Sequence, residues 1–288
     1  VTLRARDWVR VDTEHVTLRT DLPTARAREV AATMQQSRDA FASAVFPCAF
    51  SRPSRVEVTI ISHARNFEAV GEAWSAGYFQ GSESRIDDAP RRIVLRSWDP
   101  VTTRQIFQHE LAHQVGTACM PSMPIWLNEG IAAFLETAVV DDTSIALGLP
   151  PYVFVNDRVP RSYTYRGVNV TAVPRANLRT PEALVAMGRE DFYAATHRGA
   201  RAADEARVAN YASAWALVHH LELGAPEVHT PFARYLAALA APDADALALW
   251  QRELGALDLA RALATAADDE QTSFCLLYTS PSPRDRTR

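Results

Sequence analysis

The sequence contains no lysine: all 30 basic residues of the 288-residue chain are arginine, and 34 acidic residues slightly outnumber them. With a net charge of −4 and no basic cluster, neither nucleic acid nor an anionic membrane is expected as a partner. The absence of lysine beside abundant alanine indicates a GC-rich bacterial gene. No apolar run approaches the roughly 18 residues of a membrane-spanning helix. The 48% hydrophobic content is instead typical of a globular chain with a substantial core.

Cysteine is also scarce, with 3 residues in the chain, and none has the C-x-x-C spacing of a metal knuckle or a redox motif. Cys48 and Cys119 could form one disulfide in an exported protein, or lie apart as small buried hydrophobic residues. The chain begins at Val1 without a charged-then-apolar leader, and we expect that the natural N-terminus is missing. The location is therefore left open between the exported or cell-envelope fraction and the cytoplasm.

The final segment, residues 275–288, differs sharply from the alanine-rich sequence before it. Its residues 275–285 resemble the in-frame translation of an adapter used in shotgun sequencing libraries, whereas the alternative is a natural disordered tail. We therefore treat the segment as an artefact of a metagenomic assembly. The rest is divided into three parts. These are an α/β part with the candidate metal site (1–140), a loop and hairpin region beside the expected cleft (141–179) and a helical C-terminal part (180–274).

The hydrophobic patterns predict an α+β fold, in which a small mixed or antiparallel N-terminal sheet packs on helices and a mainly helical subdomain follows. Strands are expected at 8–11, 16–19, 55–61, 77–81 and 91–96, with a hairpin formed by 152–155 and 163–170. Helices are expected at 23–46, 63–70, 100–115, 125–135, 181–187, 190–197, 203–223, 230–240, 244–254 and 258–267. The strands at 77–81 and 91–96 could offer a free edge to an extended peptide, or both could be internal.

Two histidines and one glutamate carry the clearest chemical signal. His109-Glu-Leu-Ala-His113 has the H-E-x-x-H spacing, which places both imidazoles on one face of a helix. Trp126-Leu-Asn-Glu-Gly130 then offers the carboxylate of Glu129. Two histidines and one glutamate leave open the fourth position that a catalytic zinc ion needs for water, with Glu110 as the general base. The alternative is a pair of ordinary helix histidines and a solvated glutamate.

These two segments are similar to the gluzincin zinc metallopeptidases, above all the aminopeptidase N group and the peptidase-MA-like bacterial proteins. The match is close from His109 to Ala132 and looser over the order of the remaining elements. The resemblance implies a thermolysin-like fold and one zinc ion bound by His109, His113 and Glu129. It also implies hydrolysis of a peptide or protein substrate, with Glu110 as the general base.

Gluzincins use a tyrosine or histidine from a later helix to donate a hydrogen bond to the developing oxyanion. Tyr211, which opens the apolar face of the longest C-terminal helix, fits that order along the chain. His219 and His220 are the substitutes for this role. The alternative for Tyr211 is an ordinary buried core tyrosine.

The sequence also departs from the gluzincin pattern. The stretch between His113 and Glu129 is shorter than in the aminopeptidases. The sequence upstream also has no Gly-x-Met-Glu-Asn segment, which in that group supplies the glutamate that binds a free amino terminus, and residues 76–80 are the nearest candidate. Ala133 replaces the acidic residue of thermolysin-type enzymes, while Glu136 could be an outer partner of a ligand or a solvated side chain. Two alternatives to a general peptidase therefore stay open: an aminopeptidase with non-standard recognition of the amino terminus, and a non-catalytic zinc-binding or interaction module. The oligomeric state is not predicted.

Overall fold

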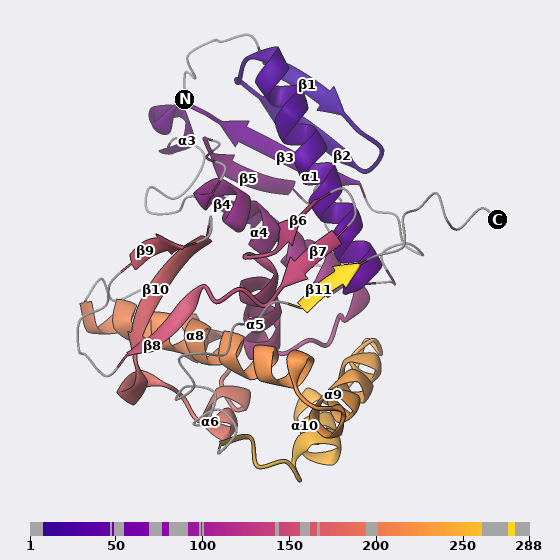
Figure 1. Ribbon diagram of the computed structural model, residues 1–288, viewed down its shortest axis with the longest axis vertical. Coiled ribbons are helices and arrows are strands. Elements are labelled where there is room, and N and C mark those ends of the chain that lie inside the picture. Colours follow the sequence, from indigo (N-terminus) through magenta and orange to yellow (C-terminus); the bar gives the residue numbers. More distant parts are fainter. Residues whose placement is uncertain are drawn as a thin grey trace, which may run out of the picture. The chain divides into compact units, whose positions relative to one another are not determined.

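The computed structural model describes residues 8–46, 48, 55–68, 77–80, 92–97, 99, 101–141, 144–155, 162–165, 168–193, 201–260 and 276–279. These residues form an α+β fold with a mixed sheet, as the sequence predicts (Figure 1). The chain divides into two compact units, the first from Val1–Val115, Ala138–Ala146 and Leu277–Arg288, and the second from Gly116–Thr137 and Leu147–Leu276. Within the described ranges, every helix is too short or too polar to span a bilayer.

A five-stranded sheet of order β1-β2-β3-β5-β4 lies at the centre of the first unit. β2 runs parallel to β3 and β3 parallel to β5, whereas the outer strands β1 and β4 are antiparallel to their neighbours. Among the described strands β4 is therefore an edge strand and β5 an internal one. The bounds are β1 (Val9–Asp12), β2 (Val16–Thr20), β3 (Val56–Ile61), β4 (Gly77–Gln80) and β5 (Arg92–Arg96).

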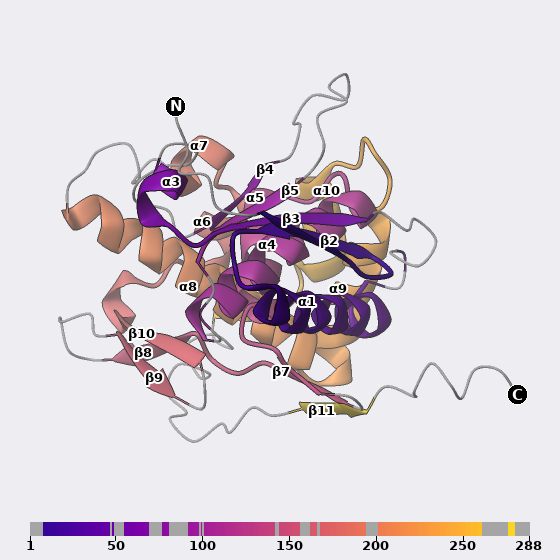
Figure 2. The same ribbon diagram turned by 90° about the horizontal axis from the view of Figure 1, so that it is seen from above.

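Helix α1 (Thr24–Ala44) covers one side of this sheet, and Figure 2 shows the first part of α4 (Thr102–Cys119) on the same side. The buried face of α1 includes Val30, Met34 and Phe41, at the helical spacings that the sequence pattern indicates. A short helix α3 (Ala64–Glu68) follows β3.

Helix α4 extends beyond its expected end near Val115. The backbone N–H of Met120 donates to the carbonyl of Gly116 at 2.8 Å, so this glycine lies inside the helix. The division between the two units falls within α4, after Val115.

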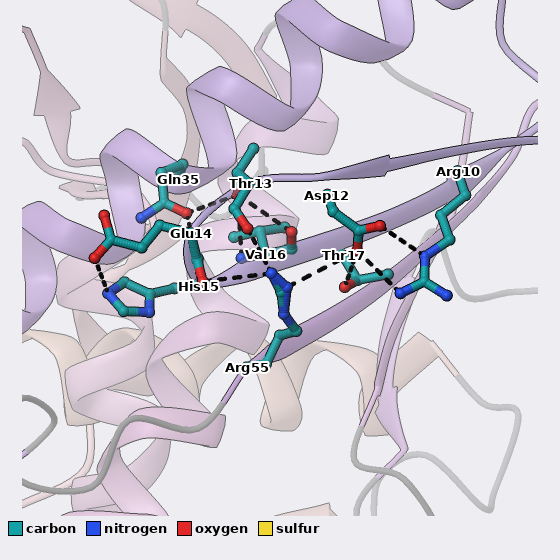
Figure 3. Close-up of polar contacts among 9 residues, drawn as sticks. All are labelled: Arg10, Asp12, Thr13, Glu14, His15, Val16, Thr17, Gln35 and Arg55. Atoms are coloured by element: carbon teal, nitrogen blue, oxygen red, sulfur yellow. Dashed lines mark hydrogen bonds and ion pairs between the residues drawn. The ribbon is translucent and has the colours of Figure 1, made fainter.

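A polar cluster ties the β1–β2 turn to its surroundings (Figure 3). The Gln35 side-chain oxygen of α1 accepts hydrogen bonds from the Thr13 hydroxyl at 2.7 Å and from the backbone N–H of His15 at 2.8 Å. The Arg55 guanidinium, next to β3, donates to the carbonyl of Thr13 at 2.5 Å. Because these bonds join the turn to both α1 and β3, they fix the position of the first hairpin on the sheet.

Helices dominate the second unit, and α5 (Ile125–Leu135) packs along α8 (Arg201–Leu223). An ideal Cβ at Gly130 would lie 2.7 Å from the Ala214 carbonyl oxygen, so the glycine allows a close approach of the two helices. Trp126 is fully buried and contacts the rings of Tyr235 and Trp250, with centroid separations of 6.4 and 5.2 Å. The remaining helices are η1 (Arg175–Asn177), α6 (Pro181–Val185), α7 (Arg189–Tyr193), α9 (Pro226–Ala238) and α10 (Ala246–Leu254).

The sequence predicts a hairpin in which residues 152–155 pair with 163–170, and this prediction is wrong. β8 (Tyr152–Val155) runs parallel to β10 (Val168–Pro174), and β9 (Ser162–Tyr165) is the antiparallel partner of β10. The seven-residue β10 is long enough to take both partners, β9 along its first half and β8 along its second. A second small sheet has the order β11-β7-β6, from β6 (Val139–Val140), β7 (Ser144–Leu147) and β11 (Leu276–Thr279).

Cys48 and Cys119 are both disulfide-bonded in the structure. Of the two arrangements that the sequence leaves open, the disulfide is therefore the one observed. Disulfides persist mainly in proteins of oxidising compartments.

Candidate metal centre

The orientation of α4 is fixed by polar contacts at its start and along its buried side. The Asp99 carboxylate accepts hydrogen bonds from the backbone N–H groups of Val101 at 2.9 Å and Thr102 at 2.6 Å. The bond from Thr102 is the largest cause of a lowered pKa of Asp99. Farther along, the side chains of Arg104 and Gln108 both donate to the Ala138 carbonyl, each at 3.2 Å. These contacts fix the rotation of the helix about its axis.

His109 and His113 lie on one face of α4, as their four-residue spacing predicts. Their ring centroids are 4.7 Å apart, with an angle of 85° between the ring planes. Both residues are partly buried. Two imidazoles at this separation can direct nitrogen atoms toward a common ion.

Glu129 lies on α5 and is only 2% exposed. A carboxylate buried to this degree is rare unless it has a partner, because burial strongly disfavours an unpaired charge. One ligand atom from each of His109, His113 and Glu129 lies within 4.8 Å of the others. Among the described residues, this is the group of side chains that could hold a metal ion.

The chemistry of the three donors fits zinc. Two imidazole nitrogens and one carboxylate oxygen form a common ligand set of catalytic zinc sites. The same donor set also suits neighbouring first-row transition metals.

Glu110 lies between the two histidines on α4 and is partly exposed. None of the hydrogen bonds or ion pairs among the described residues involves its carboxylate. A carboxylate that is accessible and not engaged by another side chain can exchange protons with a nearby water molecule. This is the behaviour that the sequence motif requires of a general base.

Tyr193, at the end of α7, makes a contact that the sequence did not predict. Its hydroxyl donates a hydrogen bond to Oε1 of Glu129. The two residues are 64 positions apart, and no motif surrounds Tyr193. The only signal in the sequence was the helix expected at 190–197, which gives no reason to select this tyrosine.

Tyr211 lies on α8. Its ring contacts Phe192, with centroids 5.3 Å apart, and the ring of Tyr193 contacts the same phenylalanine. The pKa of Tyr211 is raised mainly by burial and then by the negative charge of Glu129. Tyr152 on β8 also has a raised pKa, again mainly from burial, with smaller effects of Glu136 and Glu129. Both tyrosines are therefore expected to keep their protons at neutral pH, so their hydroxyls can donate hydrogen bonds.

His219 and His220 are less suited to the oxyanion role. His219 is buried against the rings of Trp215, at 5.0 Å between centroids, and Phe134, at 6.1 Å. Burial lowers the pKa of His219 to about 4 and also lowers the pKa of His220. The aromatic surroundings of His219 are those of a neutral core residue.

No known protein family matches the chain, and no protein of established function does.

Proposed function

We propose that this protein is a zinc-dependent metallopeptidase of the gluzincin type, which hydrolyses peptide bonds in a peptide or protein substrate. The observation that supports the proposal most directly is the proximity of the ligand atoms of His109, His113 and Glu129, all within 4.8 Å. Glu110 beside them favours an enzyme over a structural site, because a metal that only joins two helices does not need a carboxylate between its histidine ligands.

In the proposed reaction His109, His113 and Glu129 would hold one zinc ion, and Glu110 would serve as the general base and then the general acid. Zinc bound there would polarise the substrate carbonyl and lower the pKa of a water molecule toward roughly 7. Glu110 takes the proton of the attacking water and then passes it to the leaving amine. Tyr211 remains our candidate donor to the oxyanion, because it is protonated at neutral pH and lies on a helix that follows Glu129 in the chain.

Among the described strands, β4 lies at the edge of its sheet, which supports a role in holding an extended substrate. An ideal Cβ at Gly77 would lie 2.7 Å from the Ile106 side chain, so β4 lies directly against α4 one turn before His109. An edge strand offers backbone N–H and C=O groups to a peptide that adds as a further strand. Peptides that are N-methylated at single backbone amides should therefore be cleaved more slowly, because a methylated amide cannot donate to the strand.

Metal analysis combined with a peptide-library digest tests the proposal. Wild-type protein ending at Phe274 should contain one zinc ion and cleave peptides, whereas Glu110→Gln should retain the zinc and lose at least about 100-fold in activity. Unchanged activity of Glu110→Gln would refute the role of Glu110, and purified protein that does not bind zinc would refute the metal centre. Comparing free with N-terminally blocked peptides separates a general peptidase from an aminopeptidase.

The bonded state of Cys48 and Cys119 supports the exported or cell-envelope location over the cytoplasm. Thiol titration of denatured full-length protein, isolated without reductant, provides the test. One reactive thiol before reduction and three after it would agree with this location, and three before reduction would contradict it.

A further inference from the structure

We infer that Tyr193 is a positioning residue of the metal centre, which holds the Glu129 carboxylate in place and so determines how tightly the ion is bound. This inference rests on the proposed metal centre and assigns a role to a residue outside the H-E-x-x-H and Trp-Leu-Asn-Glu-Gly segments. The observation behind it is the hydrogen bond from the Tyr193 hydroxyl to Oε1 of Glu129.

The backbone next to Tyr193 is held by a chain of contacts within the second unit. The Asn210 side-chain amide, on α8, donates to the carbonyl of Phe192 at 3.1 Å, next to Tyr193 in the chain. The Arg179 guanidinium donates to the Asn210 side-chain oxygen at 2.9 Å, and the backbone N–H of Arg179 donates to the Ser213 hydroxyl at 2.9 Å. The end of α7 is therefore fixed to α8 on the side that carries the tyrosine.

Two ring contacts further restrict the tyrosine. Phe192 meets Tyr193 edge-on, with centroids 5.5 Å apart, and the Arg189 guanidinium lies 5.6 Å from the centroid of the Tyr193 ring. A side chain with its backbone anchored and its ring in contact with two neighbours loses little further entropy when its hydroxyl binds a carboxylate. The arrangement is preorganised for holding Glu129.

The expected effect on the metal follows from the behaviour of outer partners in known metal sites. Carboxylate ligands are commonly hydrogen-bonded by a second residue, and removing that residue typically weakens metal binding by about 10- to 100-fold. Because Oε1 already accepts from Tyr193, we expect Glu129 to bind the ion through its other oxygen. A hydroxyl bound to a ligand in this way acts on the metal through that ligand.

Zinc affinity, measured by competition with a chromogenic chelator on the full chain, tests the inference. Tyr193→Phe removes only the hydroxyl and should raise the zinc Kd by about 10- to 100-fold. Tyr235→Phe is the matched control, because it removes the hydroxyl of a buried tyrosine on α9 that contacts Trp126 and not a ligand residue, and it should leave the Kd within about twofold. The visible spectrum of the cobalt-loaded protein should change in Tyr193→Phe and stay the same in Tyr235→Phe.

A double-mutant cycle with Glu129→Ala then separates positioning from a general loss of structure. If Tyr193 acts through the carboxylate, Tyr193→Phe should have no further effect on the zinc Kd once Glu129 is alanine. An equal loss in both backgrounds would overturn the inference, as would a Tyr193→Phe protein that binds zinc as tightly as wild type. In these two cases the proposed function stands, whereas wild-type protein that binds no zinc overturns both.

Discussion

The side-chain amide of Gln108 donates a hydrogen bond to the carbonyl of Ala138 at 3.2 Å. Both residues are fully buried. Gln108 directly precedes His109, the first histidine of the candidate metal centre. Gln108 and His109 are neighbours on α4, so their side chains point about 100° apart around the helix. The contact at Gln108 therefore fixes the direction in which His109 points.

Replacing Gln108 with alanine is expected to destabilise the protein by about 2 to 3 kcal/mol. The change removes the hydrogen bond to Ala138 and leaves a small cavity on the buried side of α4. Urea-induced unfolding would measure the loss. Gln251→Ala is the matched control, because Gln251 is exposed on α10 and its replacement should change the free energy of unfolding by less than about 0.5 kcal/mol. Equal effects of the two changes would contradict the role of Gln108.

Gly130, the residue after Glu129, is expected to tolerate no side chain. An added Cβ would lie 2.7 Å from both the Ala214 carbonyl oxygen and a methyl group of Val218, so α5 and α8 would have to separate. Gly130→Ala should therefore lower the free energy of unfolding by about 1 to 3 kcal/mol, although alanine is the better helix former.

Gly188→Ala is the control for this change, because an added Cβ there meets nothing within 4 Å. It should leave thermal stability almost unchanged. If Gly130→Ala melted at the wild-type temperature, the close contact between α5 and α8 would be refuted.

The parts of the site that the sequence predicts are those defined by local spacing. His109 and His113 are one helical turn apart, so a helix at this position is enough to place them on one face. The edge position of β4 and the pairing of β8 with β10 could not be derived in this way, because both depend on which strands meet after the chain has folded. Hydrophobic alternation indicates a strand and does not identify its partner.

Tyr193 shows the same limit within the site. Its hydrogen bond to Glu129 joins α7 to α5, and the position of α7 depends on the contacts of Asn210 with Phe192 and Arg179. None of these residues has a recognisable spacing relative to Glu129. The sequence indicates Tyr211 instead, because it begins the apolar face of a long helix and follows Glu129 in the order that the gluzincin resemblance implies.

The burial of His219 predicts a dependence of stability on pH. Its folded pKa of about 4 lies below the value of about 6.5 expected in the unfolded chain, so the unfolded state binds more protons between these values. The free energy of unfolding should therefore fall as the pH is lowered from about 6.5 to about 4, by up to about 3 kcal/mol from this residue.

His219→Phe is the informative variant, because phenylalanine keeps an aromatic ring beside Phe134 and Trp215 and does not titrate. Urea unfolding at a series of pH values should give a shallower slope for this variant than for wild type. Identical slopes would show that His219 is accessible to protons in the folded state.

Zinc should stabilise the folded protein, because the three ligands come together only when the chain is folded. A ligand that binds the folded state alone, present at 100 times its Kd, adds about 2.7 kcal/mol to the free energy of unfolding. Zinc added to chelator-treated protein should therefore raise the melting temperature measured by calorimetry. His113→Ala should abolish most of the rise, whereas His229→Ala, on α9 and outside the ligand group, should preserve it. A full rise in His113→Ala would mean that zinc binds elsewhere in the protein.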